Sequence, residues 1–331
     1  YIVMELFDNE FKEWVEEHVH DNVTALRLRH ASASPEIKEA VSQIEYRQKA
    51  ADKFMKCRQP GGGAETVDCS FAPQWFPTAL SVEQASSATV ACFHAAVVAP
   101  LRSLLDMTMG LGVDAAAIAT LDGAEVTAIE RDSRLCLFAG ENYRDIANMK
   151  IINADSVEWL RSTDRMFDWI FIDPARRDDI GRRVYNIHDC TPDVAEILPL
   201  MLTHARDVLV KLSPMLDISA TIADLRHVRK VYIVEERGEV RELLAHISRD
   251  VESGSDSTEI EAVSVDWKFS FTRAQEAVAA ERYAEPAAGE YLYEPSPAIM
   301  KAAPFKLLCE RFDVGALHPN THLYVSPSKI D

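Results

Sequence analysis

The stretch LLDMTMGLGVD, residues Leu104–Asp114, joins an apolar segment to a turn with two glycines and then to a helical pattern. Glycine is used where the backbone must approach a ligand closely or adopt a positive φ. The N-terminus of the helix behind such a turn favours polar or anionic groups. The stretch therefore predicts the first strand, the ligand-binding turn and the first helix of an α/β sheet.

Short apolar segments recur beyond this stretch and alternate with helical patterns, which is typical of a parallel α/β sheet. The predicted strands span residues 103–107, 125–130, 151–153, 169–173, 208–212 and 230–235. Helices are expected before them, one beginning at Ser34-Pro35 and ending near Pro60, and another beginning at a capping box from Ser81 to Gln84. A strand near 263–271, a helix near 298–311 and a strand at 322–325 are expected after the polar loop 253–257.

The pattern predicts three parts: an N-terminal helical domain (1–79), a cofactor-binding α/β domain (80–252) and a small α+β segment (253–331). No apolar run reaches the length of a membrane span, so a cytoplasmic protein without a membrane partner is expected. The six cysteines lie far apart without a C-x-x-C pair, and we expect neither a metal site nor a disulfide framework.

Acidic side chains follow four of the predicted strands, namely Asp106, Glu130, Asp155 and Asp173. In open α/β sheets, ligands bind outside the carboxyl ends of the strands, so these carboxylates should face one crevice. Two classes of cofactor fit these carboxylates and the glycine turn. A dinucleotide would use the G-x-G-x-x-A pattern from Gly110 with Glu130 twenty residues later (130 − 110). S-adenosylmethionine carries no pyrophosphate, and its ammonium group could meet Asp106.

The whole set of residues resembles the class I S-adenosylmethionine-dependent methyltransferases, with motif I at 106–112, motif II at Glu130, motif III at Asp155 and motif IV at 173–176. More narrowly, the chain resembles the bacterial THUMP-like-domain methyltransferases. The matching segments are 83–87, 173–177, 211–217, 294–295 and 317–324. The resemblance implies a Rossmann-like methyltransferase sheet followed by a small ferredoxin-like piece. The family's C-terminal THUMP-like module would follow the strand at 322–325, and this sequence stops at Asp331, so either the sequence is truncated or this member lacks the module.

The resemblance implies S-adenosylmethionine as the cofactor. The residues expected to bind it are Asp106, Thr108, Gly110, Gly112, Asp114, Glu130, Asp155, Gln84 and Ser86. Thr108 stands where the family usually has the first glycine of motif I. Asp155 could instead serve only as a helix N-cap, and Gln84 and Ser86 could do no more than cap their helix.

The residues of motif IV indicate which substrate atom accepts the methyl group. The expected catalytic residues are Asp173, Pro174, Arg176 and Lys211, unless Lys211 merely forms an ion pair with Asp217. Enzymes that methylate amines have an aromatic residue where this chain has Arg176. With arginine at this position, the segment 173–176 resembles the D-P-P-R of uridine C5 methyltransferases. Those enzymes need a cysteine after the fifth strand, and this chain has Lys211-Leu212-Ser213-Pro214 there. A base amine nitrogen is therefore the first expectation.

Ribose 2′-O transfer is the second expectation. Asp173 and Lys211 would help to deprotonate the hydroxyl, with Glu235 or Glu236 as a further acid. Two alternatives from other classes are an NAD-dependent oxidoreductase and a non-catalytic RNA-binding protein on a methyltransferase scaffold.

The charge of the chain restricts any nucleic-acid surface. There are 35 basic and 53 acidic residues, a net charge of −18, which opposes a broad phosphate-binding face. The segment from Arg47 to Arg58 nevertheless carries a local net charge of +4. A solvated helix face is the commoner explanation of such a stripe. The RNA partner, tRNA or rRNA, is expected to meet Lys49, Lys53, Lys56, Arg176 and Arg177.

Overall fold

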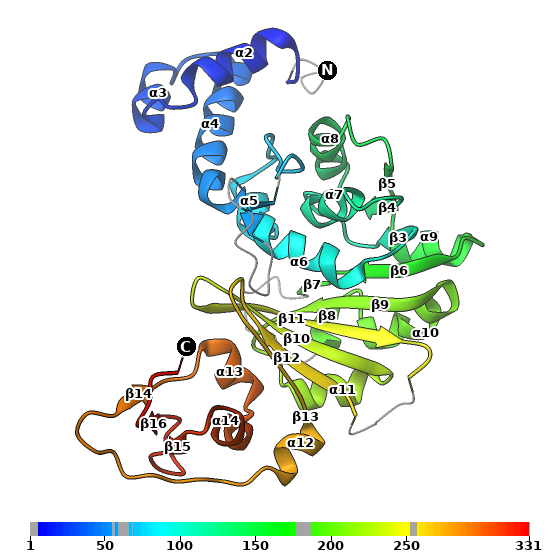
Figure 1. Ribbon diagram of the computed structural model, residues 1–331. Helices are drawn as coiled ribbons and strands as arrows, with labels where there is room; N and C mark the ends of the chain where they lie inside the picture. Colours follow the sequence, from blue (N-terminus) through cyan, green and yellow to red (C-terminus); the bar gives the residue numbers. More distant parts are fainter. Residues whose placement is uncertain are drawn as a thin grey trace. The chain divides into compact units, whose positions relative to one another are not determined.

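The computed structural model describes residues 6–54, 57–58, 66–67, 69–176, 187–251 and 257–330. They form two compact units, one made of the described residues up to Thr163 and one of those from Asp164 onward (Figure 1). The division between Thr163 and Asp164 falls inside the predicted domain 80–252, whereas the sequence pattern predicted boundaries after residues 79 and 252. Within the described ranges, no helix is both long and apolar enough to cross a membrane.

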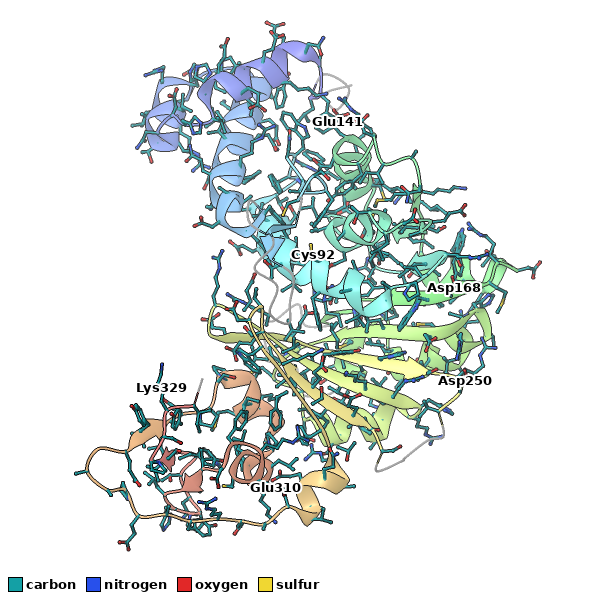
Figure 2. All side chains as sticks on the ribbon, viewed as in Figure 1. Cys92, Glu141, Asp168, Asp250, Glu310 and Lys329 are labelled. Atoms are coloured by element: carbon teal, nitrogen blue, oxygen red, sulfur yellow. The ribbon has the colours of Figure 1, made fainter. Side chains whose placement is uncertain are left out.

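The first unit begins with helices α2 (Asn9–His18), α3 (Val23–Arg29) and α4 (Pro35–Phe54). Helix α4 begins at the predicted proline but ends before Pro60, since Cys57–Arg58 (β1) is a strand paired with Thr66–Val67 (β2). A buried core joins the three helices to Trp75 and to Phe138 of helix α8 (Ser133–Asn142). Glu141 of α8, labelled in Figure 2, also forms an ion pair with Lys12 of α2. The N-terminal helices thus share a core with the following α/β region.

The predicted helix from Ser81 is wrong in its start. Helix α5 (Ala79–Gln84) begins two residues earlier, and a separate helix α6 (Ala88–Val98) follows it. Thr78 is the N-cap of α5, and its hydroxyl accepts a 3.1 Å hydrogen bond from the Ser81 N–H. Ser81 completes this capping box as its third helical residue, so Gln84 lies at the end of α5 rather than in its first turn.

The strands of the first unit are β3 (Ser103–Asp106), β4 (Glu125–Glu130) and β5 (Met149–Asn153), which pair in parallel in that order. Helices α7 (Val113–Ala119), α8 and α9 (Ser156–Ser162) follow them in turn. The predicted strands are confirmed here, and β4 has the predicted bounds. The carboxyl ends of all three strands lie at the same edge, which places the acidic residues of motifs I to III together.

The second unit contains strands in the order β13-β12-β10-β11-β9-β6. Their bounds are β6 (Phe167–Ile172), β9 (Ala205–Leu212), β10 (Val228–Glu236), β11 (Glu239–Ser248), β12 (Glu259–Val263) and β13 (Lys268–Thr272). Helices α10 (Val194–His204) and α11 (Ile218–Leu225) lie between β6, β9 and β10 in the sequence. A short hairpin of β7 (Ala175–Arg176) and β8 (Cys190–Thr191) follows β6.

Two features of this sheet differ from the prediction. Strand β11 was not expected, and it forms an antiparallel hairpin with β10 through the turn at Arg237 and Gly238, both with positive φ. The single strand expected near 263–271 is a hairpin of β12 and β13, and β12 pairs in parallel with β10. The sheet therefore continues past the boundary predicted at residue 252.

The C-terminal segment is the expected small α+β piece. It comprises α12 (Arg273–Val278), β14 (Tyr291–Tyr293), α13 (Pro297–Ala302), α14 (Phe305–Phe312), β15 (Gly315–Ala316) and β16 (Tyr324–Ser326). Its three strands form an antiparallel sheet in the order β14-β16-β15. The single helix expected over 298–311 is divided in two at Ala303, which adopts a left-handed conformation before Pro304.

Gln43 of α4 gives a test of the N-terminal packing. Its side chain is fully buried, donates to the Phe76 carbonyl at 2.7 Å and accepts from the Phe76 N–H at 3.0 Å. Gln43→Leu would leave both backbone groups without this partner, so we expect the free energy of unfolding to fall by about 2 kcal/mol. Urea unfolding followed by tryptophan fluorescence measures the change. The exposed Gln74→Leu is the control, and equal midpoints for both variants would contradict the expectation.

Candidate functional site

The turn after β3 is organised by two carboxylates. Asp106 is the buried last residue of β3, and its Oδ1 accepts a 2.9 Å hydrogen bond from the Thr108 N–H. Glu130, the last residue of β4, accepts from the Gly110 N–H through Oε2 and from the Asp132 N–H through Oε1, both at 2.9 Å. Since each carboxylate oxygen has two lone pairs, Glu130 keeps acceptor capacity for a ligand hydroxyl.

The backbone conformation at Gly112 and the nearby Tyr143 ring both favour glycine at this position. The φ of Gly112 is +85°, and a Cβ added there would lie 2.7 Å from Cε2 of the Tyr143 ring. Tyr143 is buried, and burial together with the nearby Asp114 raises the pKa of its phenol well above the ordinary value. Among the described residues, the Tyr143 hydroxyl has no hydrogen-bond partner. A side chain at this position would therefore be strained, which favours glycine at the start of helix α7.

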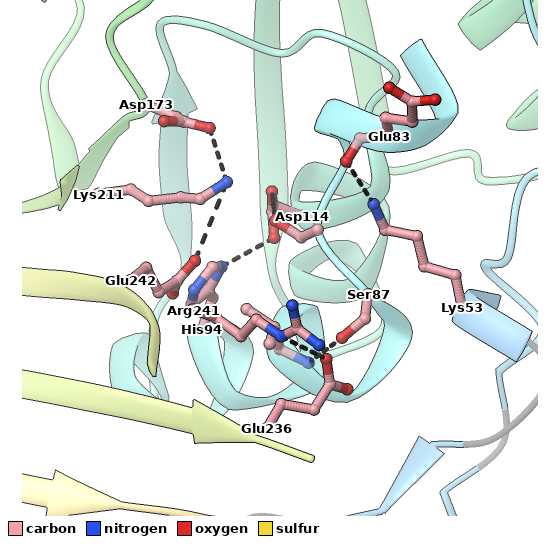
Figure 3. A network of polar contacts seen from close by, with 12 residues as sticks. Lys53, Glu83, Ser87, His94, Asp114, Asp173, Lys211, Glu236, Arg241 and Glu242 are labelled. Carbon is pink, nitrogen blue, oxygen red and sulfur yellow. Dashed lines mark hydrogen bonds and ion pairs between the residues drawn. The ribbon is translucent and has the colours of Figure 1, made fainter. Parts of the chain in front are cut away.

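Asp114 and Ser86 were both expected to bind the cofactor, and the structure brings them together. The Ser86 hydroxyl donates to Asp114 Oδ2 at 2.8 Å. The buried His94 ring contacts Asp114 Oδ1 through Nδ1, also at 2.8 Å (Figure 3). These contacts join the α5–α6 linker and α6 to the first turn of α7. Gln84 is exposed at the end of α5, and the cofactor contacts of all three residues stay predictions.

Asp155 is the N-cap of α9, as the alternative interpretation of this residue expected. Its Oδ1 accepts from the Val157 and Glu158 N–H groups, both at 3.0 Å, and the residue is exposed. The Asn153 side chain donates to the Glu130 carbonyl at 2.9 Å and so joins the ends of β4 and β5. An exposed carboxylate that already caps a helix can still accept from a ligand, so its predicted contact with adenine stays open.

The motif IV residues lie in the second unit. Asp173 follows β6, and its Oδ2 accepts a 2.7 Å hydrogen bond from Lys211 Nζ on β9 (Figure 3). The alternative partner of Lys211, Asp217, is the N-cap of α11 and accepts from the Ala220 N–H at 2.8 Å. Pro174 is buried directly after Asp173.

Sequence reasoning missed the second acid beside Lys211. Glu242 of β11 lies 4.0 Å from Lys211 Nζ, whereas Glu235, one of the two acids expected there, accepts from the Ala298 N–H. Glu236, the other, lies near Arg241. The backbone of Arg176 pairs with Cys190 in the β7–β8 hairpin. The side chain of Arg176 and the whole of Arg177 lie outside the described residues.

The basic stripe of α4 is partly used within its own unit. Lys53 Nζ donates to the Val82 and Glu83 carbonyls, both at 2.8 Å, and so holds the end of α5 (Figure 3). Lys49 forms a 3.0 Å ion pair with Glu45 on the same helix. Lys56 lies outside the described residues. Across the part of the chain that the structure describes, no group of three or more His, Cys, Asp or Glu side chains could hold a metal ion.

Comparison with solved structures extends over nearly the whole chain. A crystal structure described as a "putative methyltransferase" from Porphyromonas gingivalis W83 aligns with a TM-score of 0.80 and 26% sequence identity. The alignment covers 98% of this chain and 80% of that one. The chain has a methyltransferase fold. The Rossmann-like sheet with a small C-terminal α+β piece is thereby confirmed, and a family of ferredoxin-like domains matches residues 291–331.

Curated relatives match a shorter region. Ribosomal RNA small subunit methyltransferase J of Francisella tularensis subsp. novicida (strain U112) is 37% identical over 82 residues. The match covers 22% of this chain and 34% of the relative, and the same protein of subsp. holarctica (strain FTNF002-00 / FTA) matches equally. The chain thus spans about a third of the length of these relatives.

Gly112 gives a test of the turn. Gly112→Ala must adopt a positive φ and also displace the Tyr143 ring, whereas Gly123→Ala, at φ +71°, meets no atom within 4 Å. We expect about 1 kcal/mol of destabilisation for Gly123→Ala and at least about 1 kcal/mol more for Gly112→Ala. Urea unfolding of both variants measures the difference. Equal decreases in the free energy of unfolding for the two variants would show that the close approach of a side chain at residue 112 to Tyr143 is not destabilising.

Proposed function

We propose that this chain transfers a methyl group from S-adenosylmethionine to RNA. The observation that carries the proposal is the pair of carboxylates Asp106 and Glu130, at the ends of adjacent parallel strands, which are tied to the glycine turn by backbone hydrogen bonds. The methyltransferase fold over 98% of the chain agrees with it.

The residues of the first unit fit the proposed cofactor chemically. Asp106 would meet the ammonium group of the methionine part, Glu130 the ribose hydroxyls and Asp155 the adenine amino group. A buried carboxylate at Asp106 would repel the pyrophosphate of a dinucleotide, which favours S-adenosylmethionine over NAD. Bound there, the cofactor supplies an electrophilic methyl group on a sulfonium centre. Gly110 has a positive φ of +56°, and a Cβ added there would come no closer to another atom than 4.0 Å.

The cofactor assignment is tested by calorimetry with S-adenosylhomocysteine. Asp106→Asn and Glu130→Gln keep the shape of each side chain and remove its charge, so we expect affinity to fall about tenfold or more, equivalent to about 1.4 kcal/mol. Glu125→Gln, at the exposed opposite end of β4, is the control and should bind as the wild type does. Unchanged binding by the first two variants would refute the assignment. Binding of NADH instead would favour an oxidoreductase.

Asp173 is the proposed polar acceptor at the target atom. A base amine would donate a hydrogen bond to Asp173, which would orient the nitrogen lone pair toward the methyl carbon. As the N–C bond forms, the C–S bond would break with its electron pair left on sulfur, and the N–H proton would leave through Asp173 to solvent. Positioning supplies most of the acceleration in such a displacement. Pro174 fixes the backbone directly after Asp173, and Arg176 would hold a phosphate or the base.

A ribose hydroxyl is the second candidate target, and the pair of Lys211 with Asp173 favours it. An ammonium group 2.7 Å from the carboxylate would stabilise negative charge that develops on an oxygen nucleophile. The same pair can orient an amine, so the nature of the product decides between the two targets.

RNA is proposed as the substrate for two reasons. The curated relatives are named as ribosomal RNA methyltransferases, although the match covers 34% of their length. In this chain, the basic residues proposed to meet phosphates are Lys49, Lys53, Lys56, Arg176 and Arg177. Lys49 and Lys53 also have partners within their own unit, and the net charge of −18 favours a small contact area.

The product is identified by mass spectrometry of nucleosides in RNA from cells with and without the gene. We expect a base methylated at an amine nitrogen that is lost with the gene; 2′-O-methylribose would select the second target, and a C5-methylated pyrimidine would contradict both. In vitro, Asp173→Asn should lower methyl transfer about a hundredfold with S-adenosylhomocysteine binding unchanged. The exposed Asp168→Asn of β6 is its control. RNA binding without transfer by the wild type would indicate a non-catalytic protein.

A further inference from the structure

Three charged side chains of the second unit meet on neighbouring strands. Lys211 is paired with Leu244 across β9 and β11, and Glu242 lies two residues from Leu244, so Lys211 and Glu242 face the same side of the sheet. In the parallel pair β6 and β9, Ile172 is opposite Val210. Asp173 directly follows Ile172, and Lys211 directly follows Val210, so these two residues lie beside each other.

Burial increases from Asp173 to Glu242. The exposed fraction of the side chain is 39% for Asp173, 14% for Lys211 and 5% for Glu242. Burying a carboxylate or an ammonium group is costly unless a group of opposite charge lies nearby, and Glu242 and Lys211 lie 4.0 Å apart. Glu242 therefore stabilises the ammonium form of Lys211 from the inner side, and Asp173 does so from the outer side.

We propose that Glu242 is a positioning residue of motif IV, which holds Lys211 charged and in place against Asp173. The inference rests on the proposed function, because it assigns Glu242 a task at the same site. Glu242 lies behind Lys211 and acts through it: the lysine held between two carboxylates fixes the orientation of the Asp173 carboxylate that would receive the target (Figure 3). Without Glu242, Nζ loses its inner anchor and a larger fraction of the amine is neutral.

The test compares Glu242→Gln with Glu239→Gln, which alters an exposed glutamate of the same strand. Acetic anhydride labelling and peptide mass spectrometry report the reactivity of Lys211 at a fixed pH. We expect the labelling rate of Lys211 to rise about threefold or more in Glu242→Gln, because only the neutral amine reacts. Glu239→Gln should label as the wild type does.

Methyl transfer gives the second measurement, with methyl-tritiated cofactor and RNA from cells that lack the gene. Glu242→Gln should lower kcat roughly tenfold and leave the KM for S-adenosylmethionine unchanged, because the proposed cofactor residues are on other strands. Unchanged Lys211 labelling together with unchanged kcat would overturn the proposal.

Two further outcomes are distinguishable. If Glu242→Gln does not fold, Glu242→Asp replaces it, since this variant keeps the carboxylate but withdraws it by one methylene. It should lower kcat and raise the labelling rate of Lys211 by less than Glu242→Gln. Wild-type values of both quantities would overturn the proposal. If the wild type transfers no methyl group, the proposed function fails. The labelling rate of Lys211 then still decides whether Glu242 holds it.

Discussion

The carboxylate of Glu130 is the group on which the first unit's ligand-binding edge depends. Its two oxygens accept the N–H groups of Gly110 and Asp132, and its carbonyl accepts from Asn153. One residue therefore joins the turn after β3, the end of β4 and the end of β5. The carboxylate joins the turn after β3 to the residues after β4, and the backbone carbonyl adds the end of β5. A carboxylate held in this way has a fixed position, and a fixed acceptor would orient a hydroxyl at little entropic cost.

The sequence predicted this edge well because each of its parts has a local signal. Strand β4 was predicted with its observed bounds, Glu125–Glu130, since its apolar run is bounded by charged residues. Strand β11 gives a weaker signal. Its uninterrupted apolar run is short, Leu243-Leu244-Ala245 between Glu242 and His246, and charged residues make up much of the segment before it. Its pairing with β10 is set by the turn at Arg237 and Gly238, and Glu242 was missed together with the strand.

Polar residues that satisfy one another across the chain could not be predicted either. Ser86 and Asp114 are 28 residues apart, and each alone resembles a ligand-binding group beside the glycine turn. Their mutual hydrogen bond depends on the packing of α6 against α7, which no local pattern reports. Thr78 and Ser81 show the same limit at short range, because Ser81 could begin a capping box with Gln84 but completes the one that begins at Thr78.

Charge placement constrains how RNA can approach the second unit. In the proposed site, the carboxylates of Asp173 and Glu242 lie on either side of the Lys211 side chain, so this group would repel phosphate and would accept a hydrogen bond from a base or a sugar. In the first unit, Lys53 already holds the end of α5 and Lys49 is paired with Glu45, which reduces the charge available for phosphate contacts. The proposed RNA substrate would then be recognised through the target nucleotide itself more than through its backbone. A protein with a net charge of −18 can bind RNA in this way, since few phosphates need to be contacted.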